Sequence, residues 1–319
     1  MSVKPGSHHP ISERDWPLPI EHEKKPEMDV PGSFFRNRTL IRVSLYAAIM
    51  AAYATLPTWI ETRTGHENRL DMPADVHVGL TLVLGWLLVF RTNTSYNRWW
   101  EARTLWGRLI NTSRNMAIKV ADLVQSDRSE LEEFQREIIA FSYALRDHLR
   151  EDCQLQNLPG FEDCPDTPEH VPSYLVGRMY ERLGEWKANK TIAGIELRVL
   201  DAEARQFLDL CGGCERIKNT RTARSYRAFA RQCVGLYLAT LPWGIVDSFH
   251  WWTVPLTAII SYFMLGLETV AEDVEEPFGH DIDDLDLDKL CLAIESSVTE
   301  VFQRRFHLNA QKANAELTN

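Results

Sequence analysis

Four windows of the chain are predominantly apolar, and polar or charged segments separate them. They cover residues 39–57, 76–90, 233–246 and 251–267. A helix that crosses a bilayer needs roughly 17–25 largely apolar residues, so two of these windows fall short of that length. Length alone therefore leaves two interpretations open: four membrane helices, or four helices buried in a soluble core.

The stretch LTLVLGWLLVFRTNTSYNRWWEAR, residues 80–103, changes character in its middle. It is apolar up to Phe90 and then becomes polar, aromatic and basic, with no proline. Because proline is the residue that most strongly breaks a helix, the pattern predicts one continuous helix. This helix would begin at bilayer depth and continue into the cytoplasm, with Trp99 and Trp100 near the boundary, where aromatic side chains are common.

Helical periodicity also dominates the polar segments. Within residues 129–152, apolar side chains recur at steps of three and four residues, as on one face of a helix. Ser129 and Glu132 have the spacing of a capping box at the start of this helix. Further helices are predicted at residues 173–188, 192–211 and 286–302. Since no segment alternates convincingly between apolar and polar residues, the predicted fold class is all-α.

Arginine residues flank the apolar windows unevenly. Groups of arginine precede the first and third windows and follow the second, whereas the DSFH loop between the third and fourth contains no Lys or Arg. Positively charged residues favour the cytoplasmic side of membrane helices. The distribution therefore favours four membrane helices arranged as two hairpins, with both termini in the cytoplasm.

The overall composition narrows the classes of function. The chain of 319 residues has a formal net charge of −10, whereas nucleic-acid binding requires a basic face, so nucleic acid is not expected as a partner. The sequence contains no G-x-S-x-G, HExxH, phosphate-binding glycine loop or Rossmann fingerprint. We therefore expect a protein that is not an enzyme and requires no cofactor. A mean hydropathy of −0.27 is typical of soluble proteins, but this average hides the separation of the apolar windows.

Three bulky side chains in the second window, Leu82, Trp86 and Phe90, follow one another at four-residue steps. This spacing aligns them as a stripe on one face of a helix. Two interpretations of the stripe remain open. It either packs against a neighbouring helix or forms a hydrophobic constriction in a pore, which can gate by dewetting.

Two further motifs are candidates for binding chemistry. CGGC, residues 211–214, has the spacing of a redox or metal pair, but one pair is too small for a structural zinc site. Its glycines suit a helix C-terminus or close helix packing equally well. The run EDVEEPFGHDIDDLDLDKLC, residues 272–291, is rich in the carboxylates that a hard cation such as Ca²⁺ prefers. Its spacing is not that of an EF-hand, and a solvated acidic loop is the alternative.

Three segments together resemble the bacterial bestrophin family of ion channels. They are FRTNTSYNRWWEARTLWGRL (residues 90–109), GGCERI (212–217) and EDVEEPFGHDIDDLDLDKLCLAIE (272–295), and the resemblance extends over residues 36–301. It implies a homopentamer in the bacterial inner membrane with one central pore. Each subunit would have four transmembrane helices and a cytoplasmic helical domain.

The resemblance also implies roles for individual residues. In this family the second membrane helix lines a narrow neck through three apolar side chains, and the matching positions here are Leu82, Trp86 and Phe90. An apolar side chain upstream of GGCERI forms a second constriction at the cytoplasmic aperture, which corresponds here to Ile195. Animal members bind Ca²⁺ through their acidic run, and the matching positions of a possible site for Ca²⁺ or another divalent cation are Asp273, Glu276, Asp281 and Asp284.

On this basis the chain is expected to have five parts. They are an N-terminal cytoplasmic tail (1–35), a first transmembrane hairpin with the pore-lining helix (36–98), a cytoplasmic helical domain (99–228), a second transmembrane hairpin (229–272) and a C-terminal cytoplasmic segment (273–319). The expected function is the passage of monovalent ions through an uncharged neck, with cations weakly favoured because the chain is acidic. The alternative is a membrane-anchored helical scaffolding or regulatory protein that does not conduct ions.

Overall fold

A computed structural model describes residues 38–64 and 74–317, and within these residues every regular element is a helix. The expected N-terminal tail, residues 1–35, lies outside the described residues. In chain order the elements are α1 (Arg38–Thr64), α2 (Ala74–Leu123), α3 (Arg128–Leu149), η2 (Leu155–Asn157), α4 (Val171–Ala188), α5 (Gly194–Asn219), α6 (Arg224–Phe249), η3 (His250–Trp252), α7 (Thr253–Val274) and α8 (Leu287–Leu317). The all-α class is therefore confirmed for the described part of the chain.

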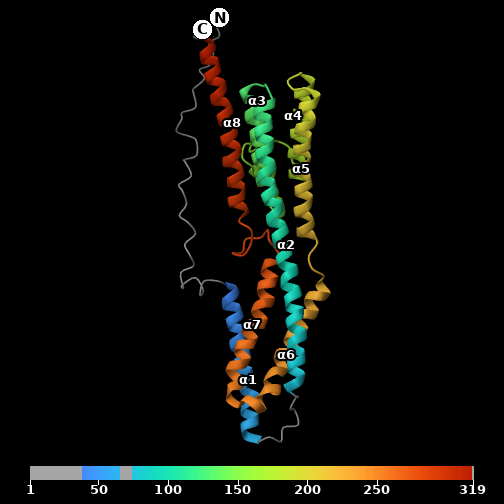
Figure 1. Cartoon of the computed structure of the whole chain (residues 1–319), viewed down its shortest axis with the longest axis vertical. Helices are drawn as coiled ribbons and strands as arrows, with labels where there is room; N and C mark the ends of the chain where they lie inside the picture. The colour runs from blue at the N-terminus through green and yellow to red at the C-terminus, as the bar shows by residue number, and fades with distance from the viewer. Residues whose placement is uncertain (1–37, 65–73, 318–319) are drawn as a thin grey trace.

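The helices form two parts that α2 connects (Figure 1). α1, α6, α7 and the first half of α2 form the apolar half, and α3, α4, α5, α8 and the rest of α2 form the polar half. α2 contains 50 residues without a proline, which makes it roughly 75 Å long. The prediction of one continuous helix through residues 80–103 is confirmed.

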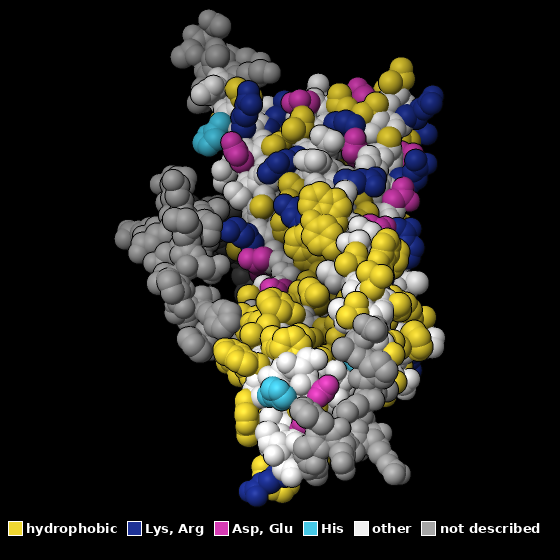
Figure 2. Space-filling view, turned by 60° about the horizontal axis from the view of Figure 1, so that its bottom comes forward, with side chains coloured by type: hydrophobic (Ala, Val, Ile, Leu, Met, Phe, Trp, Pro, Cys, Tyr) yellow, Lys and Arg dark blue, Asp and Glu magenta, His cyan; other side chains and the backbone are white. Residues whose placement is uncertain are grey.

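The apolar half presents most of its hydrophobic side chains outward. Figure 2 shows them gathered in a broad patch, below a region where acidic and basic side chains are interspersed. Three stretches of the described chain are long and apolar enough to cross a bilayer: Thr39–Arg63, Val76–Leu123 and Arg224–Val274. Only 17%, 22% and 28% of their apolar windows are buried within the chain. An exposed apolar surface of this extent is unfavourable in water. Since the helices that carry it are also long enough to cross a bilayer, the molecule is a membrane protein.

The expectation of four separate membrane helices is met only in part. The third apolar stretch consists of two helices, α6 and α7, which the short turn η3 separates. His250, the first residue of this turn, has a φ of 45°, which ends α6. α6 and α7 then pack against each other.

α1 and α7 pack antiparallel along their lengths. The hydroxyl of Thr39 near the start of α1 donates a hydrogen bond of 2.6 Å to Asp273 near the end of α7. Further along, Gly266 of α7 lies against Val43 of α1. The buried side chains of the two helices include many small ones, among them Ala47, Ala54 and Thr58 on α1 and Thr253, Thr257 and Ser261 on α7. Small residues let membrane helices approach each other closely.

The polar half has a core of large side chains, as in a soluble helical protein. Phe141 of α3 and Phe207 of α5 meet edge to face, with ring centroids 4.9 Å apart. Phe134 of α3 packs against Trp186 of α4 at 5.1 Å, and Phe302 of α8 is fully buried. This core places α5 and α8 on either side of the long helix α2.

The predicted capping box at Ser129 and Glu132 is wrong. α3 begins two residues earlier than this capping box predicts, with Asp127 at the N-cap and no capping bond from its side chain. Instead, the hydroxyl of Ser126 donates to the carboxylate of Glu130 in the first turn. The acidic side chain thus still lies at the positive end of the helix dipole, but a different pair holds it there.

Gly244 on α6 packs directly against the buried imidazole of His77 on α2. A Cβ atom at Gly244 would lie 2.3 Å from the His77 ring, whereas one at Gly235 on the same helix would meet nothing within 4 Å. We expect Gly244→Ala to lower the free energy of unfolding by about 1–3 kcal/mol through overpacking. Gly235→Ala should be neutral or slightly stabilising, because alanine favours helix. Thermal unfolding in detergent measures both, and equal melting temperatures for the two variants would contradict the close packing.

Candidate ion pathway

α2 presents the three predicted neck side chains away from its own subunit. Leu82, Trp86 and Phe90 are 67%, 62% and 57% exposed, and the Trp86 and Phe90 ring centroids lie 5.9 Å apart. On the opposite face, Leu84 and Leu88 are buried against α6 and α7. Within residues 38–64 and 74–317, the stripe is therefore left largely uncovered. Its position around a pore axis stays a prediction.

α5 runs antiparallel beside the part of α2 that belongs to the polar half. At one end of the contact, Arg98 of α2 donates to backbone carbonyls of the last turn of α5, including that of Ile217 at 2.6 Å. At the other end, Lys119 of α2 pairs with Glu203 of α5 at 2.6 Å. Ile195 in the first turn of α5 consequently lies at the end of the polar half that is remote from the apolar helices, and it is 79% exposed. Its role as an aperture stays a prediction.

A buried ion-pair network lies directly beneath the stripe. Arg91, the residue after Phe90, is 1% exposed. Its Nε atom lies 2.9 Å from Glu268 Oε2, and its Nη1 atom lies 3.4 Å from Glu275 Oε2. Both carboxylates are buried as well. Since an unpaired buried charge costs several kcal/mol of desolvation, each partner requires the others. The network fixes α2 to the end of α7 at the level where α2 leaves the apolar half.

Arg231 extends the network to α6. It pairs with Glu268 at 3.4 Å and with Glu272 at 2.5 Å. Glu275 in turn accepts a hydrogen bond of 2.9 Å from the backbone N–H of Thr222, in the connection between α5 and α6. Residues of α2, α6 and α7 therefore contact one another at one level of the molecule, next to the Phe90 end of the stripe.

The sequence prediction missed this network. The signal for it in the sequence is an arginine that directly follows an apolar window, and this pattern alone indicates only a positively charged flank. The partners of Arg91 lie 177 and 184 residues away in the chain, and Glu268 comes one residue after the fourth window.

Two of the four predicted Ca²⁺ ligands have partners within the chain. Asp273 accepts the hydrogen bond from Thr39 described above. Glu276 forms an ion pair of 2.5 Å with Arg221, in the connection before α6. Both carboxylates therefore help to attach the end of α7 to neighbouring segments.

The other two predicted ligands belong to the turn between α7 and α8. Asp284 Oδ2 accepts a hydrogen bond of 2.7 Å from the backbone N–H of Asp281. Burial raises the pKa of Asp284 to about 6, and neighbouring carboxylates act in the same direction. Within the described residues, the one group of three His, Cys, Asp or Glu side chains positioned to hold a metal ion is His148, His170 and Glu215, outside this acidic run. A Ca²⁺ site at the acidic run stays a prediction.

The CGGC motif is part of a packed helix. Cys211 and Cys214 are each 1% exposed. Burial raises the pKa of the Cys211 thiol to about 12 and that of Cys214 well above its usual range. Because the thiolate is the reactive form, this environment does not favour redox chemistry. A Cβ at Gly213 would lie 3.0 Å from Leu105 on α2, so close helix packing is confirmed, and the C-terminal cap is wrong because α5 continues to Asn219.

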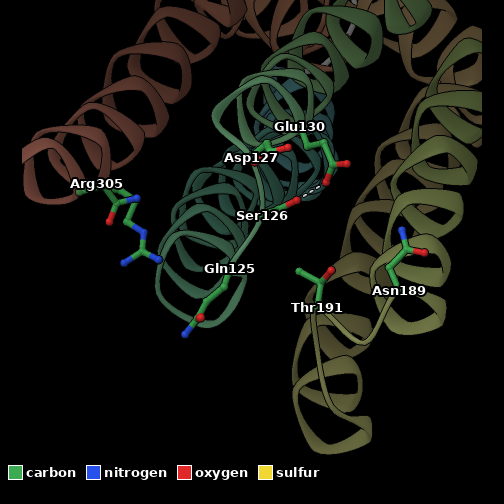
Figure 3. Close-up of a pocket in the computed structure, with 8 residues that line it drawn as sticks. Gln125, Ser126, Asp127, Glu130, Asn189, Thr191 and Arg305 are labelled. Atoms are coloured by element: carbon green, nitrogen blue, oxygen red, sulfur yellow. Dashed lines mark hydrogen bonds between the residues drawn. The ribbon is translucent and has the colours of Figure 1, made fainter. Parts of the chain in front are cut away.

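A polar groove of about 640 Å³ lies at the end of the polar half, remote from the stripe (Figure 3). It is lined by Gln125, Ser126, Asp127, Glu130, Asn189, Thr191, Arg305 and Asn309. In Figure 3 the Ser126 hydroxyl points to Glu130, while Arg305 on α8 and Asn189 at the end of α4 lie on opposite sides of the α2–α3 connection. The Ser126 hydroxyl donates to Glu130, and no histidine is among the residues that line the groove.

The fold and the site define an α-helical membrane protein. Its helix α2 carries the exposed apolar stripe next to the buried ion-pair network of Arg91. The chain belongs to the bestrophin family: the family described as Bacterial/Fungal Bestrophin protein matches residues 22–300. The resemblance seen in the sequence motifs is thus confirmed.

Similar proteins extend over most of the chain. A voltage-dependent anion channel-forming protein of Mesorhizobium japonicum is 32% identical over 274 residues, which cover 82% of this chain and 84% of that protein. A protein of the same description from Synechocystis is 29% identical over 252 residues, covering 75% and 81%. A crystal structure of a bacterial bestrophin homologue from Klebsiella pneumoniae has a TM-score of 0.75 at 22% identity and covers 83% of this chain and 98% of that one. This last similarity shows the fold alone.

The descriptions of these relatives bear on ion preference. Both curated relatives are described as forming anion channels. The weak preference for cations, which was expected from the net charge of the chain, is therefore not supported. Net charge is a property of the whole surface, whereas ions meet only the side chains along their path.

We expect Arg91→Ala to be among the most destabilising single substitutions in the chain. It would leave Glu275 buried without its cation and Glu268 with Arg231 alone, at a cost of about 3–5 kcal/mol. Arg205→Ala, in an exposed pair with Asp209, is the matched control and should cost at most about 0.5 kcal/mol. Unfolding in detergent and size-exclusion chromatography measure the difference. Comparable stability of the two variants would refute the role of the network.

Asp284 makes the stability of the protein depend on pH. Its pKa is about 6 in the folded chain against an ordinary value of 3.8, so the folded state binds the proton more tightly. This stabilising contribution is present below about pH 4 and is lost as the pH rises through about 6. Asp284→Asn keeps an acceptor oxygen for the Asp281 backbone N–H but cannot bind or release a proton, so the decrease in stability with rising pH should be smaller. Melting temperatures from pH 4 to pH 7 test this, and parallel profiles for variant and wild type would contradict it.

Proposed function

We propose that the chain forms a homopentameric channel that passes monovalent ions, with anions favoured. In this proposal Leu82, Trp86 and Phe90 of every copy form an apolar neck around a central axis. The observation that carries it is the exposure of all three side chains on one face of α2, while the opposite face of α2 packs within the subunit. Narrow apolar rings are a known means of gating water and ions.

Contacts among α1, α2, α6 and α7 support four bilayer crossings per copy, because they bring one end of each apolar segment to the same level. Thr39 at the start of α1 contacts Asp273 at the end of α7, and Arg91 and Arg231 meet Glu268 near the same end. The start of α1, the middle of α2, the start of α6 and the end of α7 therefore share one level. Together with the arginine residues around these positions, this arrangement supports two hairpins whose open ends face the cytoplasm of a bacterial inner membrane.

Aromatic side chains at this level suit contacts between copies. Tyr96 and Trp100 on α2 are 52% and 55% exposed and stack with ring centroids 6.3 Å apart. Phe229 near the start of α6 is 57% exposed. Large aromatic residues are enriched at protein interfaces. We infer that neighbouring subunits cover part of this surface.

The neck itself does not select the sign of the charge. Its side chains are uncharged, so ions would be distinguished there by size and ease of dehydration. The preference for anions rests on the descriptions of the relatives. Ile195, on the exposed first turn of α5, is proposed as the cytoplasmic aperture.

Simultaneous Leu82→Ala, Trp86→Ala and Phe90→Ala substitution should raise ion flux into liposomes several-fold, because a wider and less apolar neck is easier to hydrate. Ile259→Ala, Phe263→Ala and Leu267→Ala is a matched control, since these residues are 53%, 63% and 47% exposed at the same spacing on α7. The control should conduct like the wild type. Equal flux through both triple variants would count against the neck.

Two further measurements complete this test. A mass in detergent of five times 36.8 kDa supports the pentamer, and any other integer contradicts it. Reversal potentials in asymmetric KCl should shift towards the chloride equilibrium potential, and a shift towards that of potassium would reverse the proposed preference. Absence of flux from correctly assembled protein would favour the non-conducting scaffolding alternative.

A further inference from the structure

Three helices of the polar half meet at a cluster of two histidines and one glutamate. His148 is in the last turn of α3, His170 is the N-cap residue of α4, and Glu215 is on α5. The Nε2 atoms of His148 and His170 lie 2.7 Å and 2.8 Å from the same oxygen, Glu215 Oε1. The two imidazole rings lie 4.6 Å apart between centroids. One ligand atom from each of the three residues thus lies within 4.8 Å of the others.

We propose that His148, His170 and Glu215 form a binding site for a divalent transition metal ion of the Zn²⁺ class. Two imidazole nitrogens and one carboxylate oxygen are a ligand set that Zn²⁺ accepts, with water in the fourth position. Zinc–ligand bonds of about 2.0–2.1 Å in a tetrahedron separate neighbouring ligand atoms by roughly 3.4 Å. The pairs at 2.7 Å and 2.8 Å would therefore open by less than an ångström to admit the ion.

The site is accessible and suitably charged. The three side chains are 27%, 36% and 30% exposed, which leaves a path for the ion and its water. The carboxylate of Glu215 supplies the negative charge that a divalent cation requires, and its Oε1 atom is the oxygen that both imidazoles face. The nearby Lys218 does not occupy the site, because its ammonium group lies 3.2 Å from the His148 carbonyl oxygen and 3.1 Å from Glu151.

Metal binding would replace the two hydrogen bonds between the imidazoles and Glu215, and it would also compete with one further interaction. The Nδ1 atom of His170 accepts a hydrogen bond of 3.1 Å from the backbone N–H of Ser173, which caps α4. An imidazole that binds metal through Nε2 carries its proton on Nδ1, so this cap must be released. The first turn of α4 should consequently become less protected when the ion binds. This effect distinguishes the site from metal binding elsewhere on the chain.

The test uses full-length, tag-free protein that has been stripped with chelator. His8→Ala and His9→Ala are introduced first, because adjacent histidines can bind metal by themselves. Titration with Zn²⁺ should give one ion per chain. His148→Ala, His170→Ala and Glu215→Gln should each weaken binding at least tenfold. His307→Ala, an exposed histidine on α8, is the control and should bind as the parent protein does.

Two readouts of the intact site keep the test decisive if a variant folds poorly. X-ray absorption of the zinc-loaded parent protein should show two imidazoles and an oxygen ligand, and hydrogen exchange at the Ser173 amide should speed up on loading. Binding that is unchanged in all three variants, or a zinc environment without imidazole, would overturn the proposal. So would the absence of saturable binding to the parent protein.

Discussion

The architecture depends on one buried guanidinium. Arg91 lies where α2 passes from apolar to polar surroundings, and its charge is tolerated only because Glu268 and Glu275 meet it from the end of α7. Those carboxylates also contact Arg231 and the backbone of Thr222. A single charged group therefore sets the relative height of three membrane-associated helices. It also keeps the face of α2 that carries Phe90 turned away from the subunit interior.

The two halves are stabilised by different kinds of packing. In the apolar half, α1 and α7 approach closely through small side chains such as Ala54 and Ser261, since lipid provides no hydrophobic drive for helix association. In the polar half, water supplies that drive, and large aromatic residues such as Phe141 and Trp186 fill the core. α2 belongs to both environments: it buries Leu84 and Leu88 in the apolar half, and it adds Trp106 and Met116 to further leucines in the polar half.

Periodic and compositional features were predictable from the sequence, whereas long-range partners were not. The apolar windows, the continuity of α2 and the shared face of Leu82, Trp86 and Phe90 follow from local spacing, which a helix converts directly into geometry. Helix ends were less predictable, because several nearby polar residues compete to cap them. Ser126 and Glu130 form the bond that the spacing had assigned to Ser129 and Glu132. The pairing of Arg91 with two glutamates about 180 residues away leaves no pattern in a single sequence.

The length of α2 has a mechanical consequence. Arg91 lies roughly 48 Å from the last residue of this stiff rod and roughly 26 Å from its first residue, so one degree of tilt about Arg91 displaces the two ends by about 0.8 Å and about 0.4 Å in opposite directions. A displacement at the polar end of α2 would thus move the stripe of Leu82, Trp86 and Phe90, on the other side of the pivot, without any bending of the helix. The chain is built as a lever, and Arg91 is close to its fulcrum.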